Sequence, residues 1–195
     1  MTSTVANSAI DICSRALILI GAEPITSFED NTTEALVAVN MYEDVAQASL
    51  CNTRWRFATE QAQLSRLSDE PTGRFDAAYQ LPSNLLMLNA VTVNDHNTNH
   101  TIYGDKVFTN TSDQDEVIAD YIYRADESDW PSYFTLAVEY SLAAIFASSI
   151  ARNEGLTQIM EIKANNLMAK ARNLDSQQNT TRKLTTSRFI TERLS

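Results

Sequence analysis

Residues 133–152 read YFTLAVEYSLAAIFASSIAR, and this stretch decides the fold. On a helix, its apolar side chains cover almost every face, and small residues such as Ala143 and Ala147 let neighbouring helices approach closely. Glu139 and several serines interrupt it, so it is too short and too polar for a transmembrane span. We therefore predict a buried core helix, with Asp129 placed to cap its start.

Helical periodicity predicts three further helices around this one. Residues 3–20 carry apolar side chains at spacings of three and four, and Gly21 is placed to end that helix in a left-handed conformation. A second helix is expected over 32–52, with Asn31 as its capping residue. A last long helix, with one apolar face, is expected over 156–174. Four helices of this kind predict a helical bundle.

Between residues 57 and 126 the apolar pattern changes to a period close to two, which is typical of strands. The turn-like composition of 94–99, together with Gly104 in a second turn, predicts a hairpin over about 100–110. Four candidate strands cover 77–81, 85–93, 101–109 and 117–124. The predicted fold class is therefore mainly α: about four bundled helices, an inserted small antiparallel sheet at about 57–126, and an extended C-terminal arm.

Charge divides the chain into two regions. The net charge is −10, but residues 176–195 hold four basic residues and one acid, a balance of +3. The other 175 residues therefore carry −13, and such an acidic body repels the phosphates of nucleic acid. We predict a helical domain over 1–175 and a separate arm over 176–195.

The arm mixes cations with apolar side chains, and a tail that only had to stay soluble would not need the latter. Two interpretations stay open besides a tail without a role. The cations could contact nucleic acid, or the apolar residues could anchor the arm in a protein groove while the cations pair with carboxylates. The apolar residues favour the protein groove. The candidate binding residues are Arg182, Lys183, Leu184, Arg188, Phe189, Ile190, Arg193 and Leu194.

Candidate metal and acid–base groups have simpler explanations. His96 and His100 are four residues apart, but the asparagines around them favour an exposed turn, and no third ligand stands at a typical spacing. Glu29, Asp30 and Glu34 cluster where a helix begins, where acids interact favourably with the helix N-terminus. We predict neither a metal site nor a catalytic carboxylate pair.

Nucleophilic and nucleotide-binding chemistry is not predicted either. If the first two helices form a hairpin, Cys13 and Cys51 lie roughly 18 Å apart, too far for a disulfide, and we expect two buried or half-buried thiols. Neither cysteine is next to a histidine, and neither a Gly-x-Ser-x-Gly nor a phosphate-loop pattern occurs. The aromatic residues near element boundaries favour core or interface packing. We expect a non-enzymatic protein without a cofactor.

Several short motifs resemble a known family. Residues 16–25 (ALILIGAEPI) are similar to the Ile-Gly-x-x-Pro-Ile/Val element that opens the tail tubular protein A family of tailed bacteriophages. The match continues through 27–30 (SFED) and the helix that follows it. It also includes a Trp-x-Phe element at 55–57 (WRF) and the aromatic stretch 130–134 (WPSYF) before the central helix. The resemblance covers the order of elements along nearly the whole chain.

This resemblance implies a head-to-tail adaptor in the virion of a short-tailed phage, assembled in the host cytoplasm. Such an adaptor is one subunit of a dodecameric ring that joins the portal protein to the tail nozzle. The genomic DNA passes through this ring during ejection without specific binding, and no membrane is involved. By the same resemblance, the arm at 176–195 would reach along the portal.

Three alternatives remain open at this stage. The chain could be a head- or tail-completion connector of a long-tailed phage. It could be a DNA-contacting packaging accessory that uses its basic arm, or a small-molecule enzyme with a site in the β insertion.

Overall fold

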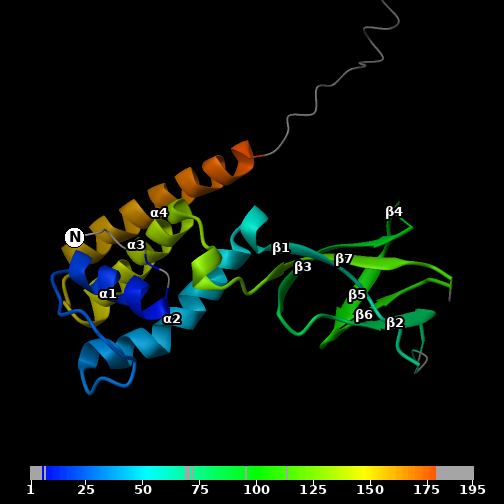
Figure 1. Ribbon diagram of the computed structural model, residues 1–195, viewed down its shortest axis with the longest axis horizontal. Helices are drawn as coiled ribbons and strands as arrows, with labels where there is room; N and C mark the ends of the chain where they lie inside the picture. Colours follow the sequence, from blue (N-terminus) through cyan, green and yellow to red (C-terminus); the bar gives the residue numbers. More distant parts are fainter. Residues whose placement is uncertain are drawn as a thin grey trace, which may run out of the picture.

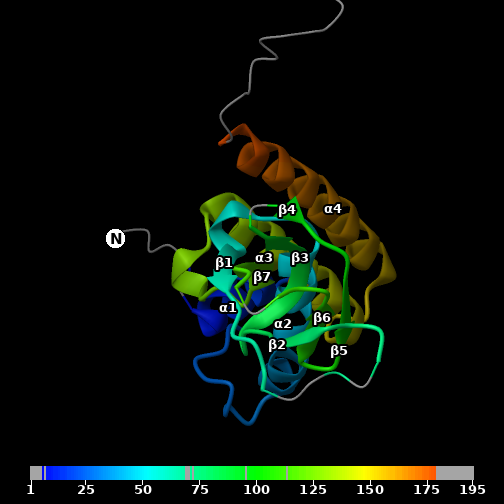
Figure 2. The ribbon, with the colours of Figure 1, turned by 90° about the vertical axis from the view of Figure 1, so that its right-hand side faces the viewer.

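The helices gather at one end of the molecule and the strands at the other (Figure 1). The computed structural model describes residues 6, 8–68, 71, 73–94, 96–112 and 114–178. Turned by 90°, the sheets stand in front of the helices and α4 runs along one side (Figure 2). Four α-helices lie within the described residues: α1 (Ala9–Leu19), α2 (Thr33–Cys51), α3 (Ser132–Ser149) and α4 (Glu154–Gln177).

Helix α3 is the centre of the helical part, as its sequence predicts. It packs against α1, α2 and α4, and Phe134, Leu142 and Phe146 are fully buried. Because apolar side chains surround α3, the other helices can cover it on several sides. Among the described residues, no helix has both the length and the apolar character needed to cross a membrane.

The helix ends differ in part from the predictions. Gly21 has φ +78°, so the predicted left-handed end of the first helix is confirmed. However, Thr32 rather than Asn31 caps α2, and its side-chain oxygen accepts from the Ala35 amide. The residue before α3 is Pro131, not Asp129. Thr32 and Pro131 have extended backbones directly before the first helical residue, which is the geometry a cap position requires.

The strands form two antiparallel sheets, not one. The first has the order β1 (Thr59–Gln63), β7 (Val117–Tyr123), β3 (Leu85–Val93), β4 (His96–Asn97). The second has the order β2 (Ala77–Gln80), β6 (Lys106–Thr109), β5 (His100–Tyr103). The predicted hairpin is confirmed as β5 and β6, with Gly104 at φ +61° in its turn.

The predicted fold class, a mainly α bundle with one small sheet, is wrong. Helices make up 47% and strands 22% of the described residues, with the strands in sheets of four and three. The two sheets share their own hydrophobic core, with Tyr79 and Val107 from the second sheet packed among Val91, Ala119 and Tyr121 from the first. The segment between α2 and α3 therefore buries enough apolar surface to form a second layer rather than a small appendage.

Candidate functional site

The predicted binding arm lies outside the described residues. This applies to Arg182, Lys183, Leu184, Arg188, Phe189, Ile190, Arg193 and Leu194. The structure does describe the base from which the arm leaves. Helix α4 continues to Gln177 and so includes the first two residues of the predicted arm, and Gln178 follows as its C-terminal cap residue.

Asp175 holds the end of α4 in place. It is 4% exposed, and its carboxylate accepts from the Arg56 backbone N–H at 3.2 and 3.4 Å and from the Tyr133 hydroxyl at 3.0 Å. Burial, followed by the hydrogen bond to Asp175, raises the pKa of Tyr133 to about 12. The base of the arm is thereby joined to the start of α3 and to the short 3₁₀ helix η1 (Arg56–Ala58).

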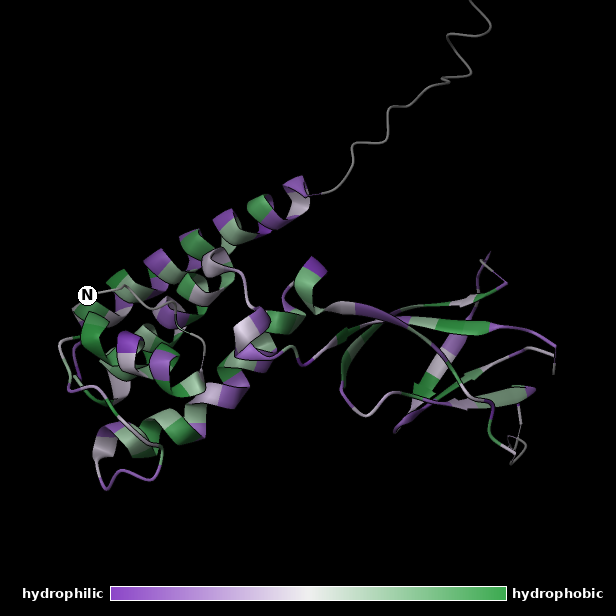
Figure 3. Ribbon diagram, viewed as in Figure 1, coloured by the Kyte–Doolittle hydropathy of each residue, from purple (hydrophilic) through white to green (hydrophobic). Residues whose placement is uncertain are grey.

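Helix α4 is buried along one narrow stripe only. Met160, Ala164, Met168, Ala171 and Asp175 form this stripe, which packs against α3. Polar and apolar residues alternate along the ribbon of α4 (Figure 3). The rest of the helix is largely exposed and includes aliphatic side chains, namely Ile159, Ile162 and Leu174. A 24-residue helix thus presents most of its surface to solvent in the isolated chain.

A second polar cluster joins the sheets to the helices. Arg124, just after β7, donates to Glu43 of α2 at 2.8 and 3.0 Å and to Glu127 at 2.6 Å. The Tyr42 hydroxyl also donates to Glu127, at 2.7 Å. Burial raises the pKa of Glu127, but the hydrogen bonds from Arg124 and Tyr42 outweigh it and leave that pKa below its ordinary value. The Arg124 guanidinium also lies 5.5 Å from the centre of the Trp130 ring.

Aromatic side chains pack beside this cluster, in the core as predicted. Trp55 and Phe134 are fully buried with ring centres 5.0 Å apart, and Trp130 lies 4.9 Å from Phe134 in an edge-on arrangement. Phe57 completes the cluster, 4.9 Å from Phe134. The WRF and WPSYF motifs therefore hold together the elements at the boundary between helices and sheets.

A family comparison identifies the class of protein. The family model for tail tubular protein matches residues 8–184, which includes every helix and strand described above. The chain belongs to the tail tubular protein family. It is therefore a structural protein of the bacteriophage tail and a component of the virion. No curated protein matches the sequence. The sequence resemblance is thus confirmed at the level of the tail tubular family.

The tail tubular protein also has an open groove of about 500 Å³ between α3 and α4. Hydroxyl and methyl groups dominate its walls, with one amide and one carboxylate, that of Glu161. The lining residues are Ser141, Ala144, Ile145, Ser148, Ser149, Thr157, Glu161, Ala164 and Asn165. These small side chains lie along two neighbouring helices.

The histidines of the tail tubular protein lie on strands rather than in the predicted turn. His96 is in β4 and His100 begins β5. The ring Nδ1 of each lies within hydrogen-bond distance of a nearby carbonyl oxygen, 2.8 Å from Asn94 for His96 and 3.2 Å from Thr98 for His100. In the part of the chain that the structure describes, no three His, Cys, Asp or Glu residues lie together as a metal site.

Asp30, one of the acids near the start of α2, has a different role from the one predicted. The Asp30 carboxylate accepts from the backbone amides of Thr26 and Ser27, and these hydrogen bonds lower the pKa of Asp30. Asp30 therefore orders the loop before α2 instead of interacting with the helix N-terminus. Glu34 does lie in the first turn of α2, as expected.

Both cysteines are free, as predicted. Cys13 is fully buried, and burial raises the pKa of its thiol to about 12. Cys51 is half-buried, and burial raises its pKa as well. Both thiols are therefore protonated, and so weakly nucleophilic, at neutral pH.

Sequence reasoning missed Asp175 and Arg124 as structural residues. Asp175 did leave a signal, because it continues the apolar stripe of α4 at a spacing of four from Ala171. A carboxylate on a buried stripe predicts a partner for it. Arg124 left no such signal, since Glu43 is 81 residues away in the sequence.

Proposed function

We propose that this tail tubular protein is the head-to-tail adaptor of a short-tailed phage. In this role it is one subunit of a ring, with 12 copies expected, between the portal protein and the tail nozzle. The observation that carries the proposal is the exposed length of α4, which leads directly into the arm from a base fixed by Asp175. A helix exposed in this way has a surface available for other subunits.

The arm over 176–195 is the proposed portal-binding element. Its apolar residues Leu184, Phe189 and Ile190 would fill a groove on the portal, and its cations would pair with carboxylates there. The last turn of α4 directs the arm, because Asp175 fixes that turn to α3 and η1. An arm that binds only when the portal is present would also impose an order on assembly.

Contacts between neighbouring subunits would use the exposed aliphatic side chains of the helical part. Leu36 and Val39 of α2 are 63% and 49% exposed, and Ile159 and Ile162 of α4 are 51% and 61% exposed. A ring needs a head-to-tail interface, in which one surface of a subunit meets a different surface of the next. Exposed aliphatic residues on two separate helices are consistent with such an arrangement.

A structural role without catalysis is part of the same proposal. The net charge of −10 supports a position around a DNA path, since a wall that bound phosphates strongly would hinder passage. The buried thiols and the loop-ordering Asp30 also have structural explanations.

The test is portal binding with and without the arm. Deletion of 179–195 leaves α4, Asp175 and the Gln178 cap intact, so circular dichroism and the melting temperature should not change. Binding to the portal protein encoded by the same phage should be lost, as measured by biolayer interferometry and native mass spectrometry. Full-affinity binding by the truncated chain would show that the arm is not the docking element.

Two full-length double variants test whether binding depends on the apolar side chains of the arm and not only on the presence of the arm. Phe189→Ser with Ile190→Ser should weaken portal binding, whereas Thr185→Ser with Thr186→Ser should not. If both variants bind like the unchanged chain, the apolar anchors have no role.

A further inference from the structure

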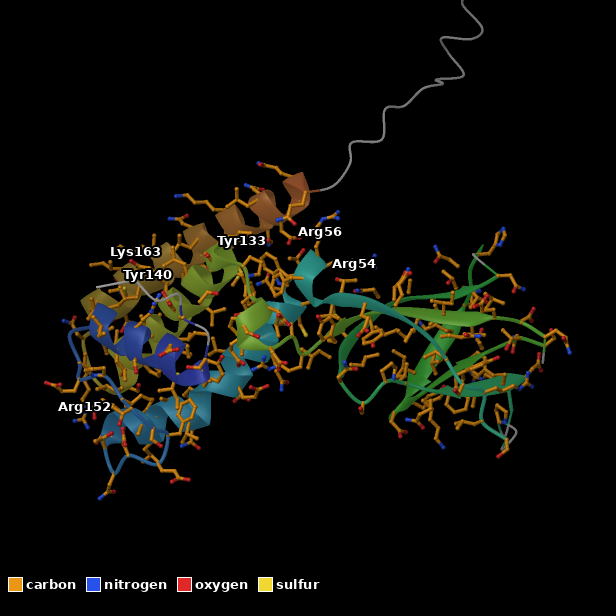
Figure 4. All side chains as sticks on the ribbon, viewed as in Figure 1. Arg54, Arg56, Tyr133, Tyr140, Arg152 and Lys163 are labelled. Atoms are coloured by element: carbon orange, nitrogen blue, oxygen red, sulfur yellow. The ribbon has the colours of Figure 1, made fainter. Side chains whose placement is uncertain are left out.

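Three arginines gather where α2 and α4 both end, beside the base of the arm. Arg54 and Arg56 follow α2; Arg56 lies near the C-terminal end of α4, and Arg54 lies beside it, next to the start of the sheets (Figure 4). The third, Arg172, lies in α4 one turn before Asp175, and its Nη1 is 3.5 Å from the Asn52 side-chain oxygen. The Arg56 backbone N–H donates to Asp175 itself, which places these residues on one surface. We call Arg54, Arg56 and Arg172 the cationic corner.

Within the described part of the chain, no carboxylate forms an ion pair with the cationic corner. All three arginines are exposed, and none forms an ion pair with a described residue. Arg54 donates to the Asn89 carbonyl, at 3.2 Å. The carboxylate closest to the corner in the hydrogen-bond network, that of Asp175, already accepts from Arg56 N–H and Tyr133. The guanidinium groups therefore remain available to an external anion.

The charge of the corner is opposite in sign to the net charge of the rest of the protein. Excluding 176–195, the chain carries −13, so a cluster of three arginines is set against an acidic background. The comparison with Arg124 is informative, because that arginine is held between two glutamates. Three arginines left without carboxylates on an acidic protein indicate a surface that meets acids on another molecule.

The corner also continues into the arm. Helix α4 ends at Gln177, within two turns of Arg172, and the arm beyond it has a balance of +3. A partner that receives the first residues of the arm would therefore lie close to the corner. Because the corner and the arm are both positively charged, they favour a single partner with an extended acidic surface.

We infer that the cationic corner binds carboxylates on the same partner surface that receives the arm. This inference rests on the proposed function, in which that partner is the portal protein. Arginine suits the contact, since its planar guanidinium can bind a carboxylate through two parallel hydrogen bonds. A protein partner is favoured over DNA, because three cations on a chain of −10 neutralise few phosphates against a repulsive background.

The experiment measures binding of full-length chains to the portal protein of the same phage over 50 to about 300 mM salt, a range in which exposed charge contacts are increasingly screened. The triple variant Arg54→Gln, Arg56→Gln, Arg172→Gln should bind at least tenfold more weakly at low salt, and its affinity should change less with salt. Its melting temperature should stay the same, because Asp175 contacts the Arg56 backbone rather than its side chain.

A second triple variant removes the same charge from other places. Arg74→Gln lies in the loop before β2, Lys106→Gln lies in β6, and Arg152→Gln lies at the turn between α3 and α4, all away from the corner. This control should bind the portal within about threefold of the unchanged chain. Equal weakening of both triple variants would mean that net charge, not the corner, matters, and would overturn the inference.

The remaining outcomes are also decisive. If the unchanged chain does not bind the portal, the proposed function fails. If it binds and the corner variant binds equally well, only the inference about the corner fails. If a 30-base-pair DNA duplex binds the unchanged chain with a steep salt dependence, and the corner variant loses this binding, the partner is DNA and the protein–protein inference is wrong.

Discussion

The hydroxyl of Tyr133 donates to the carboxylate of Asp175 at 3.0 Å, joining the first turn of α3 to the last turns of α4. The two residues are 42 positions apart in the sequence. The same carboxylate accepts from the Arg56 amide, so three segments meet at one buried acid. The base of the arm depends on this contact.

Asp175→Ala should lower the free energy of unfolding by about 2 kcal/mol, because it leaves two donors without their acceptor. Tyr133→Phe should lower the free energy of unfolding by about 1 kcal/mol. The double variant should lower it by about 1 kcal/mol less than the sum of the two single effects, because both changes remove the same contact. Urea denaturation measures all three values. Asn173→Ala, at an exposed site on the same helix, should change stability by less than about 0.5 kcal/mol. Strict additivity of the two changes would show that the contact contributes nothing.

Much of the helical part could be predicted because its signals are local. The apolar residues of α3 and the left-handed Gly21 require no knowledge of distant partners. In contrast, β1 reads TEQAQ, without an apolar alternation, and pairs with β7 at the edge of its sheet. Its stability comes from the backbone ladder with β7 rather than from its own side chains, so periodicity could not find it.

The same distinction applies to the site. The charge of the arm is readable from the sequence, as is its apolar content. The cationic corner is not, because Arg172 meets Asn52 only through contacts across 120 positions. Only folding brings Arg172 together with Arg54 and Arg56.

Arg124→Gln should cost about 2 kcal/mol of stability at pH 7, since Glu127 is 18% exposed and would lose its charged partner. The pKa of Glu127 and of Glu43 is lowered in the folded chain. The stability that the two carboxylates contribute is therefore fully present above the pKa of glutamate in the unfolded chain, about 4.3. It is lost as the pH falls through the lowered pKa values of the folded chain.

Denaturation between pH 7 and pH 3 measures this effect. The stability of the unchanged chain should fall steeply on the acid side, and that of Arg124→Gln should fall less. Arg74→Gln is the matched control, because Arg74 is exposed and carries the same charge. An identical acid profile for Arg124→Gln and the unchanged chain would contradict the assigned role of Arg124.

Glu139→Gln should stabilise the protein at neutral pH. Glu139 is 5% exposed, its Oε1 lacks a hydrogen-bond partner, and the half-exposed Arg15 lies 3.7 Å away. Burial raises the pKa of Glu139, with Arg15 opposing it. The folded chain therefore holds its proton more tightly than the unfolded chain, and stability falls as the pH rises through the raised pKa.

The difference in free energy of unfolding between Glu139→Gln and the unchanged chain should therefore become smaller toward pH 4. Thermal unfolding across this range is the measurement, and Glu161→Gln on exposed α4 serves as the comparison. A glutamine variant that is less stable at pH 7 would show that the ion pair with Arg15 outweighs the cost of burial.

Cys51 should react with a thiol reagent in the native protein well before Cys13. Cys13 is fully buried and has a pKa raised to about 12, so it should react only on unfolding. The variant Cys51→Ala isolates the rate of Cys13. Rapid labelling of Cys13 in that variant, without loss of the far-ultraviolet circular dichroism signal, would contradict the packing of α1 on α3.

We propose that this tail tubular protein is the adaptor between portal and nozzle. Cryo-electron microscopy of the full-length chain mixed with the portal protein of the same phage is the decisive test. We predict a ring of 12 copies below the portal, with density for 179–195 running along the portal surface. A tube or ring that forms without contact to the portal would contradict the account.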